Sequence, residues 1–201
     1  MQIFKIVITG GPCAGKSSAI ERVRATLEKK DYTVLAVAET STELISGGVA
    51  PWTCDCQKTY QKCLLQLQLA KEQTFLQAAE TMSAERILLI FDRGALDGKA
   101  YLKSGEFAEI LAELELTESA LLARYDGIFH LESVAKCNEQ AYTTANNKAR
   151  TETAKEAAEL DRITAKCWQN HPHRITICGA PSFEEKMHLL TCEIEALLAQ
   201  S

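Results

Sequence analysis

The chain has 201 residues and a mass of 22.2 kDa, enough to bury a core without the help of disulfides or metals. A composition that is 46% hydrophobic and 24% charged excludes disordered, collagen-like and coiled-coil chains. The formal charge of −5 argues against a protein that binds duplex nucleic acid by neutralising its phosphates. We therefore expect one globular domain over residues 1–201.

Strand and helix patterns alternate along the chain. A strand over residues 3–9 precedes a helix over 16–30, and a strand over 33–38 precedes helices over 40–46 and 57–82. Then follow strands over 86–91 and 125–131, a helix over 151–169, a strand over 174–178 and a helix over 183–198. Apolar residues in the long helix 57–82 predict burial over much of its circumference. Strands joined through helices predict an α/β fold with a five-stranded parallel sheet and helices on both faces.

The start of the chain and its apolar runs predict a cytoplasmic protein. The first residues lack the basic start and cleavage site of a signal peptide, and no apolar stretch reaches the ~20 residues that span a bilayer. The eight cysteines should then be reduced thiols. Cys54, Cys56 and Cys63 cluster, but the cluster lacks the fourth ligand of a zinc site. Three later cysteines at apolar positions are expected in the core: Cys167, Cys178 and Cys192.

Residues 10–17, GGPCAGKS, match the phosphate-loop pattern G-x4-G-K-[ST] between a predicted strand and a predicted helix. Glycines and the helix N-terminus turn backbone N–H groups toward phosphate oxygens in such loops. Lys16 is expected to bridge the outer phosphates, and the Ser17 hydroxyl to bind Mg2+. The expected nucleotide-binding residues are Gly10, Gly11, Pro12, Cys13, Ala14, Gly15, Lys16, Ser17 and Ser18.

Asp92 directly follows the third predicted strand. A carboxylate at this place holds Mg2+ in P-loop enzymes, and we expect Asp92 to do so through water. A surface aspartate that caps the next helix is the alternative. The neighbouring Arg93 can reach a phosphate or pair with Asp97.

Other motifs favour a small kinase over a GTP-binding switch protein. The N-K-x-D motif that reads guanine is missing, since residues 147–150 read NKAR. Glu39 ends the second strand, where it can accept or orient the proton of an acceptor hydroxyl; a helix N-terminal acid is the alternative. Arg150 and Arg162 belong to a predicted helical lid at about residues 133–170, and such arginines stabilise a transferred phosphoryl group. The alternative is a solvated helix whose acidic and basic residues pair with each other.

Aromatic and turn residues give weaker indications. Trp52, on a glycine- and proline-bearing segment, is a candidate for stacking on the acceptor, whereas Trp168 is expected in the core. His171-Pro172-His173 favours a turn before the last strand over a metal site. The turn over residues 179–182 is where we expect the nucleotide base.

Several segments resemble the NadR-like AAA-type ATPase/kinase family, which includes the TRPL translocation defect protein. The matching segments are VITGGPCAGKSS at 7–18, ETSTELI at 39–45, FDRGALDGKAYL at 91–102, NNKARTE at 146–152, LD at 160–161 and HPH at 171–173. The resemblance covers about residues 3–195 and implies a P-loop NTPase fold of nucleoside-kinase-like architecture, with Lys16, Ser17 and Asp92 in the roles given above.

The resemblance does not imply one reaction, because the family covers a nicotinamide riboside kinase as well as proteins proposed only to bind nucleotide and phosphoinositide. The chain has no H-x-G-H motif of the NadR adenylyltransferase domain. Pro12 and Cys13 also distinguish its phosphate loop from the ribosylnicotinamide kinase form.

Together these patterns predict an Mg2+-dependent, ATP-binding P-loop protein, with GTP left open as the nucleotide. The first hypothesis is a kinase that transfers the γ-phosphoryl group to a small hydroxyl acceptor such as a nucleoside, with Lys16, Glu39, Asp92, Arg93, Arg150 and Arg162 as its catalytic residues. The alternative is a slowly hydrolysing regulatory module that binds a protein or an anionic lipid. Assembly into a homo-oligomer is left open.

Overall fold

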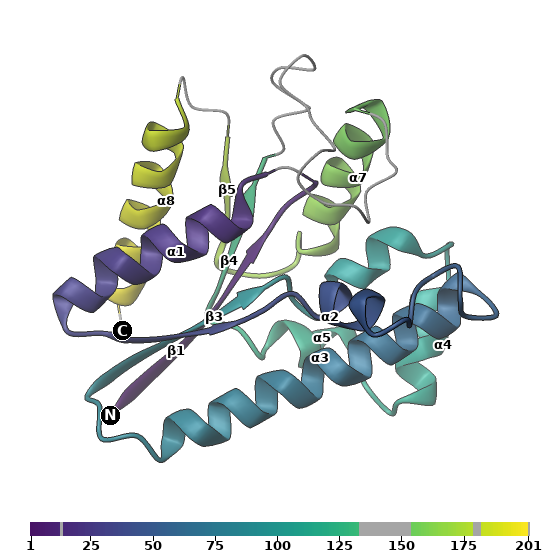
Figure 1. The fold of residues 1–201 in the computed structure, drawn as a ribbon, viewed down its shortest axis with the longest axis horizontal. Helices are drawn as coiled ribbons and strands as arrows, with labels where there is room; N and C mark the ends of the chain where they lie inside the picture. Colours follow the sequence, from purple (N-terminus) through teal and green to yellow (C-terminus); the bar gives the residue numbers. More distant parts are fainter. Residues whose placement is uncertain (13, 133–153, 179–181, 201) are drawn as a thin grey trace.

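The computed structural model describes residues 1–200 except 13, 133–153 and 179–181. Its five strands form one parallel sheet in the order β2-β3-β1-β4-β5 (Figure 1). The strands are β1 (Gln2–Thr9), β2 (Thr33–Val37), β3 (Arg86–Asp92), β4 (Gly127–Leu131) and β5 (Arg174–Ile177). The predicted five-stranded parallel sheet is therefore confirmed, with each strand starting and ending within two residues of its expected bounds.

Helices cover both faces of the sheet (Figure 1). One face packs against α1 (Lys16–Leu27) and α8 (Phe183–Leu198). The other packs against α3 (Gln57–Glu80), α4 (Glu106–Glu113), α5 (Glu118–Leu122) and the end of α7 (Ala154–Cys167). β3 is buried on both sides, since Leu88 and Ile90 face the first layer whereas Leu89 and Phe91 face the second.

The sheet register brings the ends of three strands together. Ile8 of β1 lies beside Asp92 of β3, and Val37 of β2 lies beside Phe91. The loop after β1, the start of α2 (Thr40–Ser46) and the turn after β3 therefore leave the sheet at one edge. Ligands of open α/β sheets bind at this carboxyl edge.

The long helix α3 corrects one prediction. Only one of its faces is buried, and that face carries Tyr60, Gln61, Gln68 and Glu72 as well as Leu65. Burial over much of the circumference was wrong because the helix lies on the sheet with its other side in solvent. The short helices α4 and α5 and the 3₁₀ helix η2 (Asp97–Tyr101) were not predicted.

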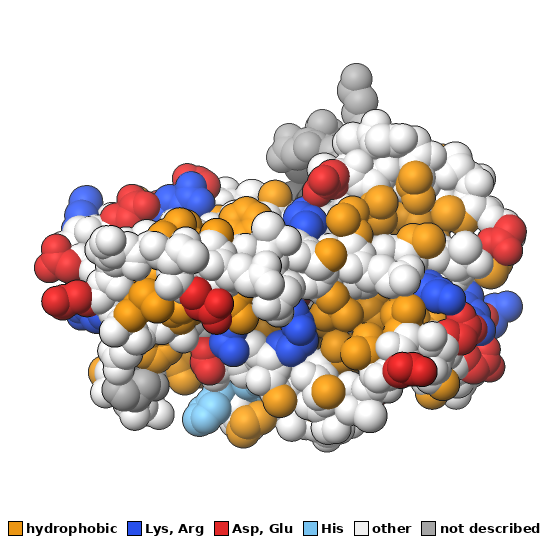
Figure 2. Space-filling model, turned by 90° about the horizontal axis from the view of Figure 1, so that it is seen from below, with side chains coloured by type: hydrophobic (Ala, Val, Ile, Leu, Met, Phe, Trp, Pro, Cys, Tyr) orange, Lys and Arg blue, Asp and Glu red, His pale blue; other side chains and the backbone are white. Residues whose placement is uncertain are grey.

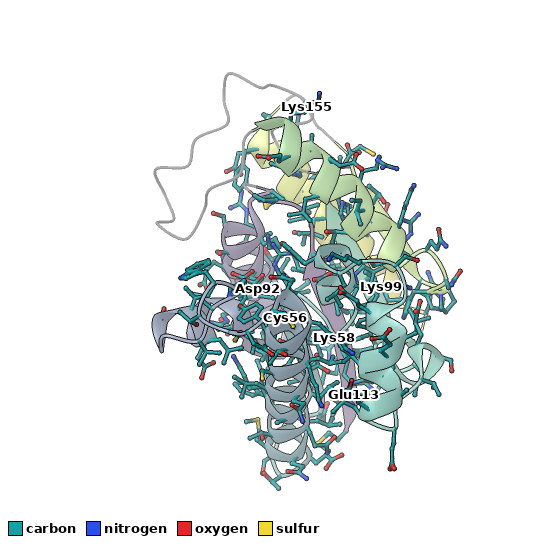
Figure 3. All side chains as sticks on the ribbon, turned by 90° about the vertical axis from the view of Figure 1, so that its right-hand side faces the viewer. Cys56, Lys58, Asp92, Lys99, Glu113 and Lys155 are labelled. Atoms are coloured by element: carbon teal, nitrogen blue, oxygen red, sulfur yellow. The ribbon has the colours of Figure 1, made fainter. Side chains whose placement is uncertain are left out.

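Ion pairs join α3 to α4 on the molecular surface. Lys58 lies 3.1 Å from Glu113 (Figure 3). Lys58 also lies 2.7 Å from Glu109, and Lys62 lies 2.7 Å from Glu113. Acidic and basic side chains are accordingly interspersed on the face that Figure 2 shows. Exposed pairs of this kind contribute little to stability.

The cysteines and aromatic residues follow the predictions in part. Cys167 and Trp168 are buried as expected, but Cys178 and Cys192 are exposed. Cys178 directly follows β5, and Cys192 lies on the outer side of α8. Residues 171–173 form the expected turn before β5, with His171 Nε2 2.9 Å from the Tyr125 carbonyl oxygen.

No helix in the described part of the chain combines the length and apolarity needed to cross a bilayer.

A buried carboxylate, Asp97, fastens the turn after β3 to its surroundings. It accepts hydrogen bonds from Thr9 Oγ1 at 2.8 and 2.9 Å, Trp168 Nε1 at 2.7 Å and the Gly94 N–H at 3.1 Å. The donors come from the end of β1, from the turn itself and from the residue after α7. Asp97 thus fixes the backbone that follows Asp92 and Arg93.

Asp97→Ala should lower the free energy of unfolding by about 3 kcal/mol, because it leaves three buried donors without an acceptor. Denaturant unfolding measures the loss. The exposed Glu80, at the end of α3, is the matched control, and Glu80→Ala should leave the midpoint unchanged. If Asp97→Ala lowers the free energy of unfolding by less than about 1 kcal/mol, the hydrogen bonds to Asp97 do not stabilise the fold as described.

Candidate functional site

The phosphate loop connects β1 to α1 and depends on two glycines. Gly10 and Gly15 have φ values of +145° and +86°, which favour glycine. A Cβ atom at Gly10 would lie 2.2 Å from the Leu131 carbonyl oxygen, and one at Gly15 would lie 3.0 Å from the Phe183 ring. Because α1 begins at Lys16, its first N–H groups are available to phosphate oxygens.

Lys16 is buried beside the loop. Its Nζ donates to the carbonyl oxygens of Gly10 at 3.3 Å and Gly11 at 3.2 Å. Burial and the nearby Arg93 charge lower the pKa of Lys16 to about 8, although Glu39, Asp92 and Asp97 act against this shift. The side chain is thus a buried cation whose charge an anionic ligand would balance.

Asp92 ends β3 with one oxygen, Oδ1, buried and without a hydrogen-bond partner. Burial raises the pKa of Asp92 to about 6, although the Lys16 charge acts to lower it. Carboxylate and hydroxyl oxygens are the ligands that Mg2+ prefers. The unpartnered Asp92 oxygen and the exposed hydroxyl of Ser17, in the first turn of α1, therefore fit this ion.

Glu39 and Arg93 form an ion pair beside Asp92. Arg93 Nε lies 2.5 Å from Glu39 Oε1, and Thr42 Oγ1 donates to Glu39 Oε2 at 2.8 Å. Burial acts to raise the pKa of Glu39, but Arg93, Lys16 and these hydrogen bonds outweigh it and lower the pKa to about 2. Glu39 is the N-cap residue of α2, yet its side chain bonds Arg93 and Thr42 rather than the helix backbone.

The backbone holds Arg93 in place for this pair. Its φ of +67° lies in the left-handed region that non-glycine residues rarely adopt. The Arg93 N–H donates to the Ile8 carbonyl at 3.1 Å, and the Arg93 carbonyl accepts from Gln68 Nε2 at 3.2 Å. The guanidinium therefore pairs with Glu39, whereas Asp97 accepts its hydrogen bonds from Thr9, Gly94 and Trp168.

A network that we did not predict supports the pair from α3. Gln68 accepts from Thr40 Oγ1 and donates to Glu72 Oε1 at 2.9 Å. Glu72 in turn accepts from Tyr125 Oη at 2.7 Å and from Arg124 Nε at 2.9 Å. Polar residues inside a leucine-rich helix carry no sequence signal that distinguishes this buried network from a solvated face.

α7 reaches the phosphate loop through Asp161 rather than Arg162. Asp161 Oδ1 accepts from the Gly11 N–H at 2.8 Å and lies 3.2 Å from His130 Nε2. Arg162 is exposed and pairs with Glu159 three residues earlier, at 2.5 and 2.9 Å. Arg162 thus pairs as the solvated-helix alternative expects, and its role as a charge clamp stays a prediction. Sequence analysis named Asp161 only in the matching segment at 160–161.

Other predicted site residues have these positions. Arg150, Cys13 and most of the predicted lid lie outside the described residues, as does most of the turn expected to hold the base. Ser18 is exposed beside Ser17, whereas Gly11, Pro12 and Ala14 are buried in the loop. Trp52 is 67% exposed between α2 and α3, so stacking on an acceptor stays a prediction.

Comparison with known proteins agrees with this geometry. The family model described as "AAA domain" matches residues 5–186. The chain belongs to the AAA domain family. The matched range contains the phosphate loop, Glu39, Asp92 and α7, and it identifies a P-loop, nucleotide-binding type of protein. No curated protein matches the chain.

The raised pKa of Asp92 gives a prediction about stability and pH. A carboxyl whose pKa rises from 3.8 to about 6 on folding costs stability above pH 6, and the cost disappears as the pH falls toward 4. Asp92→Asn should therefore stabilise the nucleotide-free protein at pH 7.5 by on the order of 2 kcal/mol, with little gain at pH 4.

Denaturant unfolding at both pH values measures this difference. Asp126→Asn serves as the control, because Asp126 accepts a 2.7 Å hydrogen bond from the Lys5 N–H and its substitution should not stabilise the protein. Destabilisation by Asp92→Asn at pH 7.5 would show that the Asp92 charge is compensated in the folded protein.

Proposed function

We propose that the protein is an Mg2+-dependent kinase that transfers the γ-phosphoryl group of ATP to a hydroxyl group of a small acceptor such as a nucleoside. One observation carries the proposal: the groups that a phosphate donor needs and a partly buried carboxylate–guanidinium pair share one edge of the sheet. Lys16, Asp92, Glu39 and Arg93 are close enough for their charges to shift one another's pKa values.

The donor side consists of the loop, Lys16, Ser17 and Asp92. Loop N–H groups and Lys16 would bind the β- and γ-phosphates, with Lys16 exchanging its present bonds to loop carbonyls for phosphate oxygens. Asp92 and Ser17 would hold Mg2+, Asp92 through water. When bound, this ion neutralises charge on the phosphate oxygens.

The acceptor side consists of Glu39 and Arg93. With a pKa of about 2, Glu39 is ionised at neutral pH and is too weak a base to remove a hydroxyl proton early. Its carboxylate can still accept a hydrogen bond from the acceptor hydroxyl and aim that oxygen at the γ-phosphorus. Arg93 Nη1 is buried without a partner and can donate to oxygens that gain charge during transfer.

The rival proposal is a nucleotide-gated regulatory module that hydrolyses ATP slowly and binds a protein or an anionic lipid. Such a module has no need for a partly buried carboxylate–guanidinium pair beside the phosphate site, which favours the kinase. ATP is the proposed donor and GTP the alternative. We further propose that residues 1–201 act as one domain, that the protein works in the cytoplasm, and that Arg150 contributes a charge clamp.

Turnover assays distinguish the two functions. ADP release is measured with ATP and Mg2+ alone and with a panel of nucleosides that includes nicotinamide riboside. A kinase shows stimulation by one acceptor or a small group of acceptors. Slow release at one rate whatever the addition would contradict the kinase and support the regulatory module.

Glu39→Gln should lower the acceptor-stimulated rate by about 10²-fold, since it removes the charge that orients the acceptor hydroxyl. The matched control is Glu43→Gln on the same helix, because Glu43 is exposed and pairs with Lys71. Steady-state kinetics with the stimulating acceptor measure both variants, and calorimetry shows that ATP still binds. Full turnover in Glu39→Gln would refute its assigned role.

A further inference from the structure

Four buried polar atoms at the end of β3, on the residue after it and in the first turns of α3 have no hydrogen-bond partner. They are Tyr60 Oη, Gln61 Oε1, Asp92 Oδ1 and Arg93 Nη1. Buried polar groups in native proteins are almost always paired, and an unpaired one costs stability. Under the proposed function, Mg2+ bound through water would partner Asp92 Oδ1, and an oxygen of the acceptor would partner Arg93 Nη1. Tyr60 Oη and Gln61 Oε1 on α3 are then still without an explanation.

Tyr60 and Gln61 lie in the first turns of α3 and are only 2% and 6% exposed. Burial, followed by the charge of Glu39 and the presence of Tyr101, raises the pKa of Tyr60 to about 12, so its hydroxyl is near the ion pair. Gln61 lies against η2, the turn that follows Arg93, where a Cβ atom at Gly98 would come within 2.5 Å of Gln61 Oε1. Both side chains therefore belong to the acceptor side of the site.

The rest of the buried face of α3 shows that this lack of partners is local. Gln68 is paired with Thr40, Glu72 and the Arg93 carbonyl. Glu72 is paired with Gln68, Arg124 and Tyr125. One face of one helix thus carries a satisfied structural network and, two turns earlier, two groups that lack partners.

We propose that Tyr60 and Gln61 bind the phosphoryl acceptor and that this acceptor is an uncharged nucleoside. The proposal rests on the kinase function proposed above. Gln61 Oε1 would accept from an N–H or O–H group of the acceptor, and Tyr60 Oη would bond a second polar atom. The acceptor's hydroxyl would meanwhile reach Glu39 and Arg93, as a molecule with a sugar hydroxyl and a separate base edge can do.

Charge balance at the acceptor side argues against an ionic acceptor. Glu39 and Arg93 neutralise each other, and the groups without partners on α3 are both neutral. The buried cation that remains, Lys16, belongs to the phosphate loop. A nucleoside monophosphate or a cationic nucleoside would bury an additional charge beside this neutral pair.

The test uses Tyr60→Phe and Gln61→Leu in the full chain. Binding of adenosine, guanosine, cytidine, uridine and thymidine, of their 5′-monophosphates and of nicotinamide riboside is measured by calorimetry in the presence of Mg2+ and a non-hydrolysable ATP analogue. Each variant should weaken binding of the best nucleoside by ~10- to 100-fold, the usual cost of losing a hydrogen bond that a buried polar group makes to its ligand. The melting temperature of each ligand-free variant should rise by about 2–4 °C, because the substitution removes an unsatisfied buried group.

Two matched controls accompany these variants. Tyr32→Phe keeps an aromatic ring over Arg86, and Gln66→Leu changes an exposed position of α3. Both should bind the nucleoside as the unmodified protein does. Lower melting temperatures for Tyr60→Phe and Gln61→Leu, with nucleoside affinity unchanged, would overturn the proposal, since the two side chains would then be structural.

The outcomes separate this proposal from the kinase function. Nucleoside binding that needs Tyr60 and Gln61, without phosphorylation, supports the binding site and contradicts the kinase. Phosphorylation that is insensitive to both substitutions supports the kinase and contradicts the site. Binding of only nucleoside monophosphates or of only the cationic nicotinamide riboside overturns the uncharged acceptor, and binding of none of the probes overturns both proposals.

Discussion

Two cations, the buried Lys16 and the partly buried Arg93, share the carboxyl edge of the sheet, and the arrangement of the site follows from keeping both charged. Each is removed from water and each repels the other, which contributes to the lowered pKa of Lys16. Glu39 balances Arg93 through a direct ion pair, and Asp92 and Asp97 act on Lys16 at longer range. A polyphosphate with Mg2+ would complete this balance, so the charges favour an anionic donor before any ligand is bound.

The surrounding hydrogen bonds hold the charges in position from several elements. Asp97 fixes the turn after β3 to β1 and to Trp168, and Gln68 holds the Arg93 carbonyl. On the opposite side of the loop, Asp161 of α7 accepts from the Gly11 N–H. Because such side chains come from segments far apart in sequence, the geometry of the site depends on the packing of both helical layers on the sheet.

Local patterns predicted the elements that carry the donor side. A β-branched run next to a glycine-rich loop predicted β1 and the start of α1. The predicted ends of the second and third strands placed Glu39 and Asp92 at the edge of the sheet. The ion pair between Glu39 and Arg93 was not predicted, since it depends on how strands β2 and β3 align. α4 and α5 were missed because they are short, with eight and five residues.

Sequence patterns predicted little of the acceptor side. Tyr60, Gln61 and Gln68 occur in a helix whose leucines alone suggested a core, and only the structure shows which polar residues face inward. Arg162 shows the reverse case: its charge suggested a lid clamp, but its position on α7 directs it to Glu159 while the preceding residue, Asp161, meets the loop. A difference of one residue on a helix turns a side chain by about 100°, which sequence spacing alone did not resolve here.

The central claim is that one site holds a phosphoryl donor and a hydroxyl acceptor together. The most direct measurement follows ATP labelled in its γ-phosphoryl group, incubated with the protein, Mg2+ and each nucleoside, with the products separated by chromatography. We expect the label in a nucleoside monophosphate, and we expect Lys16→Ala to abolish its formation. Label released only as inorganic phosphate, at one rate whatever nucleoside is present, would contradict the claim.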